Sequence, residues 1–238
     1  MAESKSTIHN AQTAKANTAR DALDAGRRLR ITEIFHSLQG ESRPTGLPTV
    51  FVRLTGCPLR CVFCDTAYAF EGGDWQDFDA IVAEIARYET PLVCVTGGEP
   101  LAQPNCLNLL TELADAGYDV SLETSGALDI EPVDQRINIV MDIKTPGSGE
   151  ASRNLLGNLA HLKASDQLKF VICDRADYEW SKALCAEHAL TELCELMFSP
   201  SIGQLEPREL AEWILADHLQ VRFQVQLHKF LWGDIPGH

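Results

Sequence analysis

The chain has 238 residues, 45% of them hydrophobic, which excludes general disorder and favours a single domain around one core. It carries 34 acidic and 20 basic side chains, a net charge of -14, so direct binding to nucleic acid or to an anionic membrane surface is not expected. No apolar run approaches the roughly 20 residues that span a bilayer. Without a signal-peptide core at the start, the eight cysteines indicate a reducing, cytoplasmic compartment.

Residues 1–30 differ in composition from the rest of the chain. They are rich in Ala, Thr, Asn and Ser and have few large apolar side chains, so they cannot bury a core of their own. We expect a mobile N-terminal arm over 1–30 and a catalytic domain over 31–238. A transit peptide is the alternative for the arm, although Asp21 and Asp24 do not fit that pattern.

From residue 31 onward, apolar runs alternate with segments of helical period, which predicts an α/β protein with a largely parallel sheet. Strands are predicted at 49–55, 92–96, 119–123, 137–143, 167–173, 195–198 and 222–227, and helices at 77–88, 104–116, 176–188 and 207–218. A complete βα barrel takes about 250 residues, and the segment 127–136 is too short for a full helix. We therefore predict an incomplete, open βα barrel.

Polar side chains gather where these strands end. Examples are Thr96-Gly97-Gly98-Glu99, Glu123-Thr124-Ser125-Gly126 and Asp142-Ile143-Lys144. Parallel α/β sheets bind their ligands at the carboxyl ends of the strands, so the functional site is predicted at this edge.

Three cysteines lie within eight residues, directly after the first predicted strand, at Cys57, Cys61 and Cys64. A four-iron cluster normally takes four thiolates, and a loop with three would leave one iron open to another ligand. Zinc is the alternative, with His36 or Cys94 as a distant fourth ligand, since no second ligand pair exists. A redox-active or incidental cysteine cluster stays open as well.

The C-x3-C-x2-C spacing, with Gly97-Gly98 after a later strand, resembles the signature of the radical S-adenosylmethionine (SAM) superfamily. Two further motifs, Leu38-Gln39-Gly40-Glu41 and Cys64-Asp65-Thr66, resemble one of its families, the 7-carboxy-7-deazaguanine synthases of queuosine biosynthesis. The resemblance covers about residues 31–230. Ser42 departs from it, because a glycine is expected there.

The resemblance implies an enzyme that converts 6-carboxy-5,6,7,8-tetrahydropterin into 7-carboxy-7-deazaguanine, with ring contraction and release of ammonia. It implies a [4Fe-4S] cluster, SAM and Mg²⁺ as cofactors, an electron donor such as flavodoxin, and a homodimer. Two other functions stay open: another radical SAM enzyme, such as a glycyl-radical activase, and a zinc or iron–sulfur protein without catalysis.

The resemblance also assigns residues, none of them as a catalytic acid or base. Cys57, Cys61 and Cys64 hold the cluster and Thr66 the magnesium ion; Leu38, Gln39, Gly40, Arg53 and Thr96 bind the substrate; and Phe63, Cys64, Asp65, Gly98, Ser125, Asp142, Ile143, Lys144 and Ser199 bind SAM. Arg53 as an ordinary paired arginine, and Lys144 in a structural ion pair with Asp142 or Glu123, are the alternatives.

Overall fold

The computed structural model describes residues 26–233, 235 and 237, and over this part the chain forms one mixed sheet in the order β3-β1-β2-β4-β5-β6-β7-β8-β9. The strands are β1 Arg28–Leu38, β2 Pro48–Leu54, β3 Asp74–Asp77, β4 Leu92–Gly97, β5 Asp119–Thr124, β6 Asn138–Ile143, β7 Gln167–Ile172, β8 Glu195–Pro200 and β9 Arg222–Phe223. From β2 to β9 neighbouring strands are parallel, whereas β1 is antiparallel to both β2 and β3. Because β3 and β9 are edges that do not meet, the predicted open barrel is confirmed.

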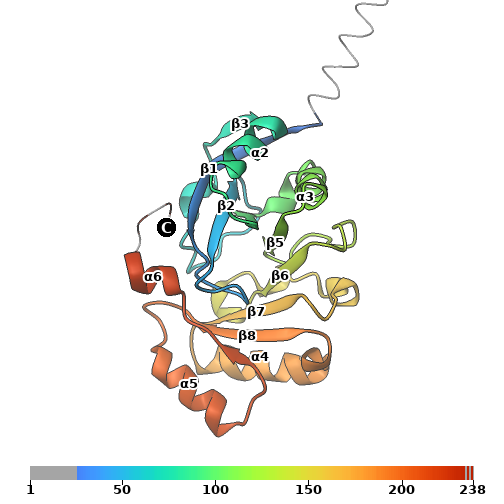
Figure 1. Cartoon of the computed structure of the whole chain (residues 1–238). Coiled ribbons are helices and arrows are strands. Elements are labelled where there is room, and N and C mark those ends of the chain that lie inside the picture. The colour runs from blue at the N-terminus through green and yellow to red at the C-terminus, as the bar shows by residue number, and fades with distance from the viewer. Residues whose placement is uncertain (1–25, 234, 236, 238) are drawn as a thin grey trace, which may run out of the picture.

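In the described part of the chain, five α-helices connect or follow the strands: α2 Phe78–Ala86, α3 Cys106–Asp115, α4 Arg175–Glu187, α5 Pro207–Ala216 and α6 Leu227–Trp232. The first four match the predicted helices. As predicted, no α-helix lies between β5 and β6. In Figure 1 α3 and α4 lie along the outside of the curved sheet, and α6 lies apart from them, across the sheet. No helix in the part that the structure describes is long and apolar enough to cross a membrane.

The core forms between the sheet and these helices. Helix α3 shows the pattern well, since its buried residues Cys106, Leu109, Leu110 and Leu113 recur at helical spacing and form one face. Each fully buried leucine side chain contributes about 1.5–3 kcal/mol. The polar ends of the strands are thereby held on a rigid frame.

Three parts of the sheet differ from the sequence prediction. β1 was not predicted, because a register shift between Ile31 and Glu33 interrupts its alternation, nor was β3, which has no buried residue. The predicted strand 222–227 ends at Phe223, and the chain turns into α6 at Leu227. Ordered structure begins before residue 31, and most of the predicted arm lies outside the described residues.

Candidate active site

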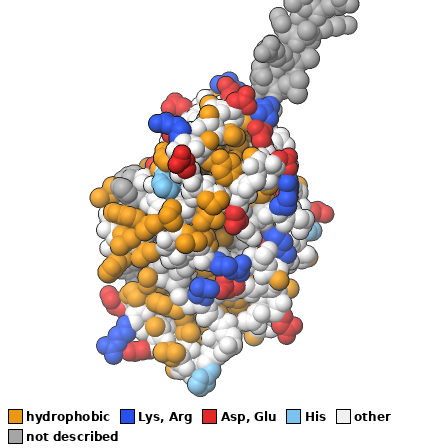
Figure 2. All heavy atoms as spheres, viewed as in Figure 1, with side chains coloured by type: hydrophobic (Ala, Val, Ile, Leu, Met, Phe, Trp, Pro, Cys, Tyr) orange, Lys and Arg blue, Asp and Glu red, His pale blue; other side chains and the backbone are white. Residues whose placement is uncertain are grey.

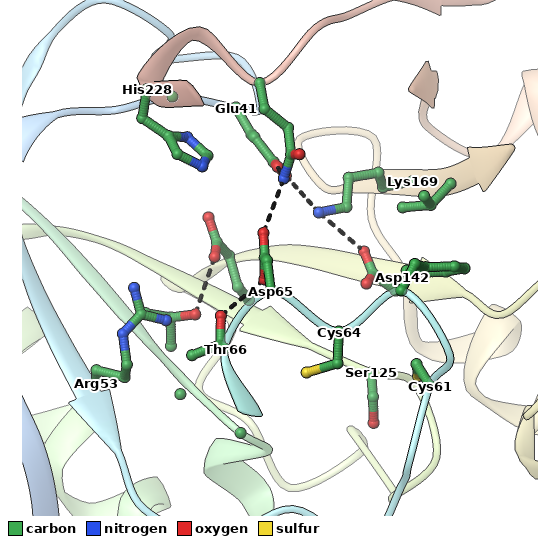
Figure 3. Close-up of a pocket in the computed structure, with 18 of the residues that line it drawn as sticks. Glu41, Arg53, Cys61, Cys64, Asp65, Thr66, Ser125, Asp142, Lys169 and His228 are labelled. Atoms are coloured by element: carbon green, nitrogen blue, oxygen red, sulfur yellow. Dashed lines mark hydrogen bonds and ion pairs between the residues drawn. The ribbon is translucent and has the colours of Figure 1, made fainter. Parts of the chain in front are cut away.

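A cavity opens at the carboxyl ends of β2, β4, β5 and β6, the edge that the sequence predicts. Its volume is about 400 Å³, within the range of small-molecule sites. Of the predicted site residues it is lined by Leu38, Gln39, Gly40, Arg53, Cys57, Cys61, Phe63, Cys64, Asp65, Thr66, Thr96, Gly98, Ser125, Asp142 and Lys144. Figure 3 shows Arg53 on one side of the cavity, Lys169 and Asp142 on the other, and the cysteine loop between them.

The cysteine loop presents all three thiols to this cavity, and each is partly exposed, whereas the other five cysteines are buried. Burial raises the pKa of the Cys57 and Cys61 thiols, so iron binding must displace their protons. Three soft thiolate donors facing one space fit an iron–sulfur cluster. Neither candidate for a fourth zinc ligand lies at this site. Cys94 is buried and does not line the cavity, and His36 is exposed, with its ring stacked on that of Tyr88.

Two glycines allow the end of β4 to pack directly on the cysteine loop. A Cβ at Gly98 would lie 2.4 Å from the carbonyl oxygen of Gly56 and 2.8 Å from Cys57 Cβ. Gly97 has φ +156°, and a Cβ there would lie 2.4 Å from the carbonyl oxygen of Leu54. The bare backbone beside the thiols therefore has no room for a side chain.

A buried carboxylate fixes the neighbouring strand end. Glu99 is fully buried and accepts hydrogen bonds from the hydroxyl groups of Thr124 and Ser125 and from the backbone amides of Ser125 and Leu101. It joins the ends of β4 and β5, which places Ser125 at the cavity surface.

The predicted substrate residues meet around a carboxylate that the sequence analysis did not assign. Glu123, at the end of β5, accepts hydrogen bonds from Gln39 Nε2 at 3.3 Å and from the Thr96 hydroxyl at 3.0 Å. Gln39 is only 2% exposed although it lies in a loop. Arg53 lies on the same side of the cavity and pairs with Glu33 through Nε at 2.7 Å. The paired state considered above is thus present, and Arg53 faces the cavity as well.

The opposite side of the cavity is a chain of buried ion pairs. Lys169 on β7 pairs with Glu41 and, at 3.3 Å, with Asp142, which also pairs with Lys144 at 2.6 Å. Burial opposes the charge of Asp142, Lys144 and Lys169, but the lysines lower the pKa of Asp142, and the carboxylates raise the pKa of both lysines. Asp142 and the two lysines are therefore ionised at neutral pH.

Two side chains with oxygen atoms that can bind a metal ion, Asp65 and Thr66, lie just past the third cysteine. The Thr66 hydroxyl donates to Asp65 Oδ1 at 2.8 Å, and both residues line the cavity. Burial raises the pKa of Asp65, but this hydrogen bond and Lys229 outweigh it, so the pKa is lowered. A hydroxyl beside an ionised carboxylate fits a hard divalent cation such as Mg²⁺.

Helix α6 and the residue before it cover the cavity from the C-terminal side. The Leu227 amide donates to the Gly40 carbonyl at 2.9 Å, and Gln226 Nε2 donates to Glu41 Oε1 at 2.6 Å and to Asp65 Oδ2 at 3.2 Å. The His228 ring lies so close to Gly40 that a Cβ at position 40 would be 2.0 Å from the His228 Nδ1 atom.

Ser42, where a glycine was expected, has a left-handed φ of 63°, a conformation that glycine adopts more easily than serine.

Two predicted SAM contacts are not brought to the cavity. Ile143 packs in the hydrophobic core, and Ser199 is buried within β8. Neither is among the described residues that line the cavity, whereas Ser201 and Ile202, just after β8, are. Strand alternation explains Ile143, because Asp142 and Lys144 on either side of it share the face that lines the cavity. Ser199 has the same spacing as Ser201 but lies within β8, whereas Ser201 follows the end of the strand.

Comparison with known proteins agrees with this geometry. Residues 51–142 match the radical SAM superfamily. The chain is 45% identical over 208 residues to the 7-carboxy-7-deazaguanine synthase of Chlorobaculum tepidum, covering 86% of this chain and 94% of that protein. It is 42% identical to the synthase of Koribacter versatilis, covering 86% and 97%. The crystal structure of QueE from Escherichia coli superimposes with a TM-score of 0.70 at 25% identity, covering 84% of this chain and 95% of that chain.

Proposed function

Because the chain belongs to the 7-carboxy-7-deazaguanine synthase family of radical SAM enzymes, we propose that it converts 6-carboxy-5,6,7,8-tetrahydropterin into 7-carboxy-7-deazaguanine in queuosine and 7-deazapurine biosynthesis. The reaction contracts the ring and releases ammonia. One observation carries the proposal: the three clustered thiols, Arg53 and Gln39 line one cavity of small-molecule size.

The cofactor side of the cavity is assigned to the cysteine loop and the strand ends beside it. Cys57, Cys61 and Cys64 hold the iron–sulfur cluster, and Phe63, Asp65, Gly98, Ser125, Asp142 and Lys144 surround the space for SAM. When bound, the reduced cluster and SAM supply a 5′-deoxyadenosyl radical that removes a hydrogen atom from the substrate. We leave Ile143 and Ser199 out of this set because both are buried away from the cavity.

The substrate side lies around Arg53 and Glu123. The guanidinium of Arg53 offers a planar pair of donors to the substrate carboxylate. Gln39, Glu123 and Thr96 present amide, carboxylate and hydroxyl groups suited to the donors and acceptors of the amino-pyrimidinone ring, with the Leu38 and Gly40 backbone beside them. These groups orient the substrate and exclude water from it.

Thr66 is proposed to bind a magnesium ion, with Asp65 ionised next to it. Both belong to the loop that holds the cluster, so the ion would lie where the cofactor and substrate sides of the cavity meet. Mg²⁺ keeps several water or substrate oxygens among its ligands, so one or two protein oxygens are sufficient.

We further propose a homodimer, a cytoplasmic location and an electron donor such as flavodoxin. Hydrophobic side chains gather on one face beside α6 in Figure 2, and Phe230 and Leu231 on that helix are 84% and 45% exposed. Apolar surface of this kind supports burial against a second copy. All eight cysteines are free, which supports a reducing compartment.

The proposal is tested with anaerobically reconstituted protein, SAM, Mg²⁺, a reductant and 6-carboxytetrahydropterin. We expect about four irons per chain and formation of 7-carboxy-7-deazaguanine, detected by mass spectrometry. Stoichiometric zinc without iron would contradict the cluster. An intact cluster that cleaves SAM but forms no deazapurine would refute the substrate.

A further inference from the structure

Arg53 is held from behind the cavity wall by a second residue, Glu33. The two face each other across the antiparallel pair of β1 and β2, and Glu33 Oε1 accepts a hydrogen bond from Arg53 Nε at 2.7 Å. The side chain of Arg53 is only 15% exposed and that of Glu33 only 21%. Arg53 is part of the cavity lining, and Glu33 is not. Glu33 therefore acts on the cavity only through Arg53.

The atom that Glu33 binds decides how the guanidinium is presented. Because the bond uses Nε, both terminal amino groups of Arg53 remain for a ligand, and together they form a two-pronged donor that matches a carboxylate. The guanidinium carbon also lies 5.7 Å from the centre of the Phe35 ring and 5.9 Å from that of Tyr68. The plane of the group is thus constrained by rings as well as by a hydrogen bond.

Tyr68 completes the arrangement from the segment after the cysteine loop. Its hydroxyl donates to the same Oε1 atom of Glu33 at 2.7 Å. Burial and the hydrogen bond to Glu33 raise the pKa of Tyr68 to about 12, so the phenol stays protonated at neutral pH. Burial opposes the charge on Arg53, but the hydrogen bond to Glu33 and the negative charge of that carboxylate act against it, and the pKa of Arg53 is raised. The guanidinium thus stays charged inside the wall.

A similar set of residues elsewhere shows what this arrangement adds. On α2 and the residues after it, Glu84 accepts from Arg87 at 2.7 Å and from the Tyr88 hydroxyl at 3.2 Å. Arg87 is 73% exposed, and all three residues belong to one short segment. Such a surface cluster contributes little. The buried set instead joins two strands and the segment after the cysteine loop.

We propose that Glu33 is a positioning residue for substrate recognition, which orients Arg53 so that its terminal amino groups meet the substrate carboxylate, and that Tyr68 holds Glu33 in place. This inference rests on the proposed function, because it takes Arg53 as the group that binds the carboxylate. Under this proposal, the preference of the enzyme for a carboxylated ring depends on Glu33, which does not line the cavity.

The experiment compares two competitive inhibitors of the holoenzyme with SAM and Mg²⁺: 7-carboxy-7-deazaguanine and 7-deazaguanine, which lacks the carboxylate. The ratio of their inhibition constants measures carboxylate recognition alone. We expect Glu33→Ala to reduce the preference for the carboxylated ligand about tenfold or more, because misplacing a binding group by about 1 Å has effects of this order or larger. Glu33→Gln keeps an acceptor and is expected to retain part of the preference, and Tyr68→Phe to lower it about twofold to threefold.

Glu84→Ala is the matched control, since it removes the same kind of residue from the exposed cluster, and its ratio should equal that of the wild type. A purely structural role for Glu33 would weaken both inhibitors equally and leave the ratio unchanged, which would overturn the inference. If Glu33→Ala does not fold, an unchanged ratio in both Glu33→Gln and Tyr68→Phe overturns it. Arg53→Ala separates the two proposals. If its ratio equals that of the wild type, Arg53 does not bind the carboxylate and the assignment of Arg53 is refuted. If Arg53→Ala loses the preference but the Glu33 variants keep the wild-type ratio, only the positioning role of Glu33 is refuted.

Discussion

One wall of the cavity comes from β1, β2 and the cysteine loop, which lie close together in the sequence, whereas the opposite wall takes single side chains from β6, β7 and α6. In the first wall, the thiols and the terminal amino groups of Arg53 are available to ligands. In the second wall, Lys169, Asp142 and Lys144 bind one another or Glu41. The first wall therefore offers unpaired groups to ligands, whereas the charged groups of the second wall are already paired and give the space for SAM its shape and balanced charge.

The two walls also depend on different parts of the fold. The first is fixed by local turns and close backbone packing, such as Gly98 against Gly56. The second is fixed by sheet register, because Asp142 on β6 pairs directly with Lys169 on β7. A substitution in the first wall should therefore change ligand binding directly. A substitution in the second wall should lower the stability of the fold together with the activity.

The largest effect is expected for Cys61→Ala in the first wall. Removing one of three thiolates leaves too few ligands to hold the cluster, so turnover should be abolished and the iron content should fall. Cys185→Ala, a buried cysteine on α4, is the control. It should keep its iron and its turnover at a cost of about 1 kcal/mol in stability. Normal turnover by Cys61→Ala would refute the assignment of the cluster.

Gly98→Ala tests the backbone contact in the same wall. The new methyl group would overlap the Gly56 carbonyl oxygen, which is 2.4 Å from the Cβ position, so the end of β4 must move away from the cysteine loop. We expect turnover to fall about a hundredfold through misplacement of the cofactor side. Gly157→Ala has open space around it and should behave like the wild type. Equal activity of the two variants would show that the close packing is not needed.

The same difference between the walls limited what the sequence could predict. Cys57, Arg53 and Gln39 belong to short motifs in which neighbouring residues confirm one another. Glu123 belongs to a polar strand end that the sequence analysis singled out, but nothing in the sequence gave it a role. Lys169 is the one charged residue in the strand Gln167–Ile172, and nothing around it in the sequence indicates a site. Its only signal was a charged side chain within a largely apolar strand, which burial makes costly unless a partner is present.

The fold prediction was right where periodicity is strong and wrong where local geometry intervenes. The first four helices and the open sheet follow from alternating apolar segments. β1 was missed because a bulge breaks its alternation after Ile31. Residues 224–226 alternate like a strand, but the Leu227 amide bonds to the Gly40 carbonyl and begins α6 over the cavity. Such a contact between distant segments leaves no local trace in the sequence.

Lys169→Met should affect the second wall most strongly. It leaves the carboxylates of Glu41 and Asp142 buried with less compensation, so we expect a loss of about 3–5 kcal/mol in the free energy of unfolding and about tenfold lower turnover. Lys182→Met removes surface ion pairs of α4 instead and should cost at most about 1 kcal/mol. Denaturant unfolding measures both. Similar losses in the two variants would show that the buried network is no more important than a surface pair.

The smallest effect is expected for Thr66→Ala, which lies where the two walls meet. The variant should retain its iron, because no thiolate is lost, but it should need about tenfold more Mg²⁺ for half-maximal turnover. At saturating Mg²⁺ its activity should approach that of the wild type, since Asp65 remains and water replaces the hydroxyl. Thr111→Ala removes a hydroxyl from α3, away from the cavity, and should leave the Mg²⁺ requirement unchanged.

The Mg²⁺ dependence of Thr66→Ala also shows whether Thr66 binds the ion or only holds Asp65 in position where the two walls meet. Asp65 accepts hydrogen bonds from Thr66 and from Gln226. If Thr66 only fixed Asp65 beneath α6, Thr66→Ala would lower turnover equally at all Mg²⁺ concentrations, and Gln226→Ala would have the same effect. If Thr66 binds the ion, only Thr66→Ala shifts the Mg²⁺ dependence, because the hydroxyl oxygen is the ligand that is lost.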